Sequence, residues 1–175
     1  MRLRIGMVIG AALLVAAAPA ASPHEPGLHQ HGVAKLQIAV DGPVLSLFLD
    51  SPLDNLLGFE HYPSTRQQTT AVGALRERLH DAGAVFVPTP AARCAATTVR
   101  LESPVFESKP AAGGGAHADL EAEYVFRCDF PDRLRDLEVR LFDGFPGMRR
   151  IDVQVAGPRG QVAAALSASQ RTVAW

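Results

Sequence analysis

Residues 117–128 alternate between polar and apolar side chains, and this pattern constrains the fold more than any other segment does. The polar set is His117, Asp119, Glu121, Glu123 and Arg127, and the apolar set is Leu120, Ala122, Tyr124, Phe126 and Cys128. A period of two is typical of a strand with one buried face and one solvent-exposed face. We therefore expect a half-buried sheet with a second layer packed on one side.

Other segments of strand length alternate in the same way. An Asp-Gly pair at residues 41 and 42 is a hairpin signal, and it predicts that the strands before and after it pair with each other. A turn at Pro158, Arg159 and Gly160 predicts a second hairpin. The further strands that the pattern predicts cover residues 31–40, 44–49, 95–102, 137–142, 151–155, 161–166 and 171–175.

Only one segment has a clear helical pattern. Residues 66–80 follow a possible N-cap at Ser64 or Thr65, and Gly83 is a candidate stop signal. Three apolar residues share one face of this helix, namely Val72, Leu75 and Leu79. We predict an α+β fold, dominated by an antiparallel sheet or sheets, with one main helix packed on a face.

The first twenty residues predict a signal peptide. Arg2 and Arg4 precede an apolar run at residues 5–18, and Ala18-Pro19-Ala20 has the spacing of a cleavage site. The alternative is a membrane anchor, but the run is shorter than the roughly 20 residues that a spanning helix needs. We therefore expect residues 1–20 to be removed, and residues 21–175 to form a single periplasmic domain.

The charge balance argues against a nucleic-acid partner. The chain has 17 basic and 18 acidic residues, and loss of the signal peptide with Arg2 and Arg4 leaves 15 basic against 18 acidic. This composition gives no basic patch. No second apolar run reaches spanning length, so we expect no membrane span in the mature chain.

Two cysteines, Cys94 and Cys128, are present in the chain. An even count in an exported protein predicts one disulfide. Closing the loop between Cys94 and Cys128 with a disulfide would stabilise the fold by roughly 3.5 to 4 kcal/mol in the chain-entropy model. A pair of thiolate metal ligands is the alternative, but nothing near either cysteine adds a further sulfur ligand.

Histidines at two places could bind a metal ion. His29 and His31 are two residues apart, so on an extended chain they share a side, and two imidazoles can bind one zinc ion. His117 and Asp119 share the polar face of the strand at 117–128 in the same way. The alternative for the first pair is a solvent-exposed tail that binds no metal. The alternative for the second pair is the ordinary solvent-exposed face of a strand.

The remaining histidines have simpler interpretations. His61 lies in a turn between Glu60 and Tyr62, where a lone histidine more often makes a structural hydrogen bond. His80 ends the predicted helix, where a protonated imidazole suits the helix dipole. Motifs of the G-x-S-x-G and H-E-x-x-H types are absent from the sequence, so we expect no enzyme. A hydrolase with a metal-activated water remains an alternative, although no general base stands out.

Several short blocks of this sequence occur in the same order as in the members of a known protein family. They are residues 29–34 (HQHGVA), 51–52, 55–61 (NLLGFEH), 102–104, 117–124 (HADLEAEY), 126–128, 139–142 and 145–147 (FPG). In this order they resemble the ZrgA-like family of exported bacterial zinc-binding proteins. The resemblance covers nearly the whole mature chain.

The resemblance implies a periplasmic protein associated with zinc uptake. It implies a metal-ligand set made of His29, His31, His61, His117 and Asp119. Members commonly carry a long insertion rich in His, Asp and Glu just before the block that begins at His117. This chain departs from them there, because its connector at residues 107–116 contains no histidine.

Two functions are compatible with these observations. The first is a periplasmic accessory protein that captures zinc and passes it to an uptake transporter or its binding protein. The second is a non-enzymatic module that docks another envelope protein, with metal binding incidental or absent, and the missing insertion favours it.

Overall fold

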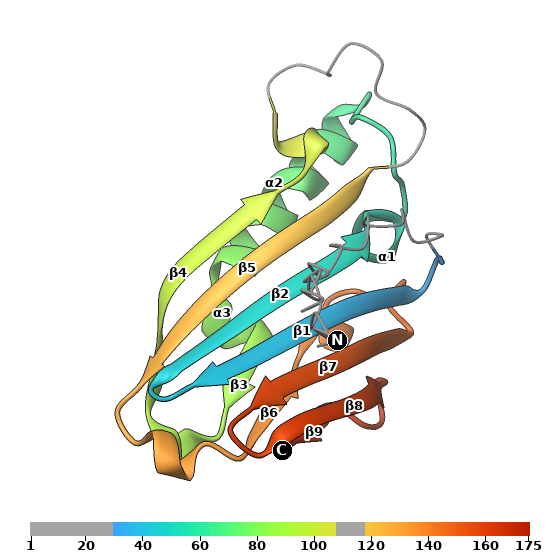
Figure 1. Ribbon diagram of the computed structural model, residues 1–175. Helices are drawn as coiled ribbons and strands as arrows, with labels where there is room; N and C mark the ends of the chain where they lie inside the picture. The colour runs from blue at the N-terminus through green and yellow to red at the C-terminus, as the bar shows by residue number, and fades with distance from the viewer. Residues whose placement is uncertain (1–29, 108–117) are drawn as a thin grey trace, which may run out of the picture.

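A computed structural model describes residues 30–107 and 118–175, and a six-stranded sheet is its largest feature (Figure 1). The strand order is β4-β5-β2-β1-β7-β8, and neighbours are antiparallel except for the parallel pair β1 and β7. The bounds are Val33–Asp41 for β1, Val44–Pro52 for β2, Cys94–Glu102 for β4, Asp119–Cys128 for β5, Arg150–Gly157 for β7 and Gly160–Leu166 for β8.

A second layer covers one face of this sheet. It contains the main helix α2 (Arg66–His80), which lies behind β4 and β5, and a small sheet ordered β3-β6-β9 (Figure 1). The bounds are Phe86–Pro88 for β3, Asp136–Val139 for β6, Thr172–Ala174 for β9, Asp54–Leu57 for α1, Ala82–Val85 for α3, Pro90–Ala92 for η1, Pro104–Phe106 for η2, Pro131–Arg133 for η3 and Leu141–Asp143 for η4. The predicted strand-dominated α+β class is confirmed.

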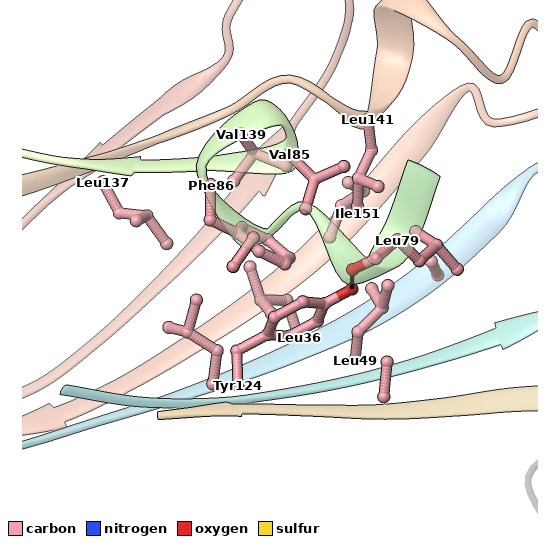
Figure 2. Packing of buried hydrophobic residues seen from close by; sticks show 14 of the residues in the cluster. Leu36, Leu49, Leu79, Val85, Phe86, Tyr124, Leu137, Val139, Leu141 and Ile151 are labelled. Atoms are coloured by element: carbon pink, nitrogen blue, oxygen red, sulfur yellow. Dashed lines mark hydrogen bonds between the residues drawn. The ribbon is translucent and has the colours of Figure 1, made fainter. Parts of the chain in front are cut away.

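The alternation of the sequence decides which side chains enter the core. In β1, Leu36 and Ile38 are buried, whereas the alternate residues Lys35 and Gln37 are exposed. Residues from the sheet meet residues from the second layer, so that Leu36, Leu49 and Tyr124 pack toward Phe86, Val139 and Leu79 (Figure 2). The predicted buried face of the strand that contains Tyr124 is therefore confirmed.

The bounds of α2 agree with the sequence prediction, but its end does not depend on Gly83. Thr65 is the N-cap, because its hydroxyl oxygen accepts a hydrogen bond from the backbone N–H of Gln68 at 3.2 Å. After α2, the carboxylate of Asp81 accepts a hydrogen bond from the N–H of Ala84 at 3.2 Å. This cap starts α3, so Gly83 lies inside the next short helix rather than acting as a stop.

The predicted strand at residues 137–142 is too long. Strand β6 ends at Val139, and the 3-10 turn η4 follows it. Leu141 and Phe142 are both buried, which consecutive residues of a strand with one buried face cannot be. The N–H of Arg140 donates to the carbonyl of Val85 at 2.9 Å, and this bond anchors the chain where it leaves the strand.

The predicted disulfide between Cys94 and Cys128 is confirmed. The two residues are direct register partners across β4 and β5, so the bond ties an edge strand to its neighbour. The predicted signal peptide and most of the 107–116 connector lie outside the described residues. Within the described ranges, no helix is both long and apolar enough to cross a membrane.

Tyr124 provides a test of the contact between the two layers. Its hydroxyl donates to the carbonyl of Leu79 in the last turn of α2 at 3.0 Å, and its ring packs edge-on against Phe86 (Figure 2). Burial raises the pKa of the Tyr124 phenol well above its usual range. We predict that Tyr124→Phe lowers the free energy of unfolding by about 1–2 kcal/mol, because the buried carbonyl loses its partner. Urea unfolding followed by circular dichroism measures this change.

The control for this variant is Tyr62→Phe. The hydroxyl of Tyr62 donates to the carbonyl of Glu107 at 2.6 Å in an exposed position, where water can replace it. We expect a change within about 0.5 kcal/mol for this control. Equal losses in the two variants would contradict the role assigned to the Tyr124 hydroxyl.

Candidate metal site

The β1–β2 hairpin brings two segments of the candidate site to one end of the sheet. The strands are antiparallel, and Lys35 is the register partner of Asp50. Continuing this register by four residues places His31 opposite Asp54. Because α1 follows β2 directly, its first residue lies beside the chain that enters β1.

The chain after α1 returns toward His31. Gly58 caps α1 with a φ of 75°, in the left-handed region that favours glycine, and its N–H donates to the carbonyl of Asp54 at 2.9 Å. This turn ends the helix after a single turn. It allows Glu60 to reach the imidazole of His31.

His31 lies between two carboxylates from different segments. Its Nε2 is 3.0 Å from Oε1 of Glu60, and its Nδ1 is 3.4 Å from Oδ2 of Asp54. The side chain of His31 is 55% exposed, that of Asp54 is 34% exposed and that of Glu60 is 10% exposed. The imidazole therefore joins a nearly buried carboxylate to a partly exposed one.

Both ring nitrogens of His31 face carboxylate oxygens. A neutral imidazole has one N–H donor and one lone pair, whereas an ionised carboxylate only accepts hydrogen bonds. The neutral ring can therefore donate to one of the two carboxylates, and its other nitrogen and the second carboxylate are placed where they could bind a cation.

The distance between His31 Nε2 and Glu60 Oε1 is that of a hydrogen bond, and it is also close to the separation of two ligands on one metal ion. Two donor atoms on a tetrahedral zinc ion with bonds of about 2.0–2.1 Å lie roughly 3.3 Å apart. The observed separation is 3.0 Å. Asp54 would then be the partner of the second ring nitrogen, since ligating histidines commonly donate their other N–H to a carboxylate. These residues can therefore provide two zinc ligands and one orienting group.

His61 is placed immediately after Glu60 and is exposed. Its Nδ1 lies 2.9 Å from the carbonyl oxygen of Tyr62, and its ring packs 5.2 Å from that of Phe59. A carbonyl oxygen only accepts, so Nδ1 carries the hydrogen in this bond. In the neutral ring, the lone pair is then on Nε2, which is the state that a metal ligand needs.

The other predicted ligands lie at or beyond the edge of the described residues. Asp119 begins β5 and is the register partner of Pro52, so it lies near the same end of the sheet as α1. The carbonyl of Asp119 accepts a hydrogen bond from the Ser103 hydroxyl at 2.7 Å. His29 and His117 lie outside the described residues. In the ranges 30–107 and 118–175, no three His, Cys, Asp or Glu side chains form a group that could hold a metal ion.

A buried asparagine holds the backbone beside His31. Asn55 is 1% exposed, and its Oδ1 accepts a hydrogen bond from the N–H of Gly32. Its Nδ2 donates to the carbonyl of Val33 at 3.0 Å and to the hydroxyl of Ser51 at 3.1 Å. One side chain thus links the start of β1, the end of β2 and helix α1.

Sequence reasoning did not predict Asp54, Glu60 or Asn55 as parts of the site. A usable signal was present for Asp54, because the turn at Asp41-Gly42 fixes the hairpin register that sets it opposite His31. Asn55 is the only asparagine of the chain and stands in an apolar stretch. No local pattern predicts the position of Glu60, since it depends on the turn at Gly58.

Gly147 provides a test of the packing behind the site. A Cβ at this position would lie 2.8 Å from the carbonyl oxygen of Asn55 and 3.1 Å from that of Asp54. We predict that Gly147→Ala lowers the free energy of unfolding by about 1–3 kcal/mol, because α1 has to move. Chemical denaturation of the purified protein measures the change.

Gly73 in the exposed part of α2 is the matched control, because a Cβ there meets nothing within 4 Å. We expect Gly73→Ala to raise the free energy of unfolding by about 0.5–1 kcal/mol through helix propensity. Effects of the same sign and size in the two variants would contradict the close packing of residue 147 on α1.

Comparison with known families agrees with the resemblance found in the sequence. The sequence model of a family described as "ZrgA family zinc uptake protein" matches residues 28–175. This range includes every residue of the site described above. A comparison with curated proteins gave no match.

Proposed function

Because this chain belongs to the ZrgA family of zinc uptake proteins, we propose that it captures zinc in the periplasm and supports zinc uptake. The observation that supports this proposal best is the pair formed by His31 Nε2 and Glu60 Oε1 at 3.0 Å. Asp54 beside the other ring nitrogen adds the orienting group that metal-bound histidines commonly have.

The proposed site needs further ligands, since zinc usually takes four. His61 follows Glu60 in the chain, and its hydrogen bond to Tyr62 leaves Nε2 as the lone-pair nitrogen. His29 precedes His31 by two residues, and His117 precedes Asp119 by two residues. We propose that the remaining ligands come from this predicted set.

The exposure of the site suits an ion that is taken up and released again. His31 is 55% exposed, so an incoming ion or an acceptor protein can reach the imidazole. Zinc is then cargo rather than a cofactor, and we propose that the chain is not an enzyme. The proposed acceptor is a zinc uptake transporter or its binding protein.

Export fits the same proposal. The Cys94–Cys128 disulfide is of the kind that persists in oxidising compartments such as the periplasm. We propose that residues 1–20 direct export and are then removed, on the basis of their sequence pattern.

Zinc titration calorimetry tests the assignment of the two ligands. We predict that His31→Ala and Glu60→Gln each weaken zinc binding at least about tenfold, since loss even of an outer-shell partner commonly costs that much. His80→Ala is the control, because His80 is exposed at the end of α2 and should leave the affinity unchanged. Indistinguishable titrations for the parent protein and both site variants would overturn the proposal and favour the docking alternative.

Zinc binding should also depend on pH. Histidine ligates zinc only in its neutral form, and free histidine has a pKa of about 6.5. We predict that zinc affinity falls at least about tenfold as the pH is lowered from about 7.5 to about 5.5. Circular dichroism at both pH values checks that the protein stays folded, and a pH-independent affinity would contradict ligation by histidine.

A further inference from the structure

The two edges of the six-stranded sheet differ in how well they are protected against pairing with another strand. The β4 edge carries the charged side chains of Arg100 and Glu102, and its register shifts between Ala96 and Thr98. Helix α2 packs on the face of the sheet behind this strand (Figure 1). Charges and a bulge are common devices by which proteins block an edge strand.

Among residues 30–107 and 118–175, nothing gives strand β8 either of these protections. Its sequence, GQVAAAL, contains no charged residue and no proline. The side chains on its outer face, Gln161, Ala163 and Ala165, are exposed. Val162 on the opposite face is 37% exposed, and only Leu166 at the end of the strand is buried.

The outer side of β8 is also without a partner strand within the described part of the chain. The sheet order ends at β8, which pairs only with β7 among the described strands. Strand β9 lies near β8, but it pairs with β6 in the small sheet. Exposed edges of this kind, uncharged and without a bulge, are sites of strand addition.

We propose that β8 pairs with β8 of a second copy of this chain, so that two sheets join across a two-fold axis. In such an isologous contact, the same strand meets itself in antiparallel orientation. An uncharged strand can do this without placing like charges opposite each other. Because the β4 edge of each copy is protected, no further copy adds there, and the assembly ends at two copies.

The charges that flank β8 are compatible with this pairing. Arg159 lies in the turn before the strand, and in an antiparallel pair it would face residues 167–170 of the second copy. That segment contains only Ser, Ala and Gln, so no cation meets Arg159 there. Nothing in β8 itself offers a charge that would select a different, charged partner strand.

Sedimentation velocity over a wide range of protein concentration tests the proposal. We expect the parent protein to form a dimer, and Ala163→Lys/Ala165→Lys to lose it, because lysines on both copies repel each other. The control is Ala95→Lys/Thr97→Lys, which adds the same charge at exposed positions of β4 and should keep the dimer. A chelator in all samples excludes bridging by zinc, so the result is independent of the proposed zinc site.

A charge-reversal experiment identifies the partner as a second copy. Ala163→Glu/Ala165→Glu alone should be monomeric, and its equal mixture with the lysine variant should restore the dimer. A parent protein that stays monomeric at every concentration, a lysine variant that still dimerises, or a mixture that does not associate would each overturn the proposal. Circular dichroism of every variant confirms that the fold is unchanged.

Discussion

The side chain of Asn55 is the interaction on which the arrangement of the site depends. It is buried, and its amide makes hydrogen bonds to the backbone of Gly32 and Val33 and to the hydroxyl of Ser51. A buried polar group that loses its partner costs about 1–3 kcal/mol, so these bonds resist displacement. His31 precedes Gly32, and Asp54 precedes Asn55, so the same bonds hold the backbone segments that carry the imidazole and the carboxylate beside it.

The sequence predicts those elements whose pattern is contained in a single segment of the chain. Strand β5 and helix α2 were found because alternation and a helical apolar face are visible in single segments. The parallel pairing of β1 with β7 was not found, because it joins segments more than one hundred residues apart, and no local pattern encodes it. The same holds for the site: His31 was predicted as a ligand candidate, but Glu60 depends on the left-handed turn at Gly58.

The site and the β8 edge occupy different borders of the described part of the molecule. The chain that enters β1 and helix α1 lie at the ends of the central strands, whereas β8 forms a lateral border (Figure 1). Pairing of two copies through β8 would therefore leave His31 accessible.

The most direct measurement is anomalous diffraction at the zinc absorption edge from crystals of the zinc-loaded protein. The proposed site predicts an anomalous peak at bonding distance, about 2 Å, from Nε2 of His31 and from a carboxylate oxygen of Glu60. A zinc ion bound elsewhere, with His31 still held only by Asp54 and Glu60, would contradict the assignment of these residues as zinc ligands.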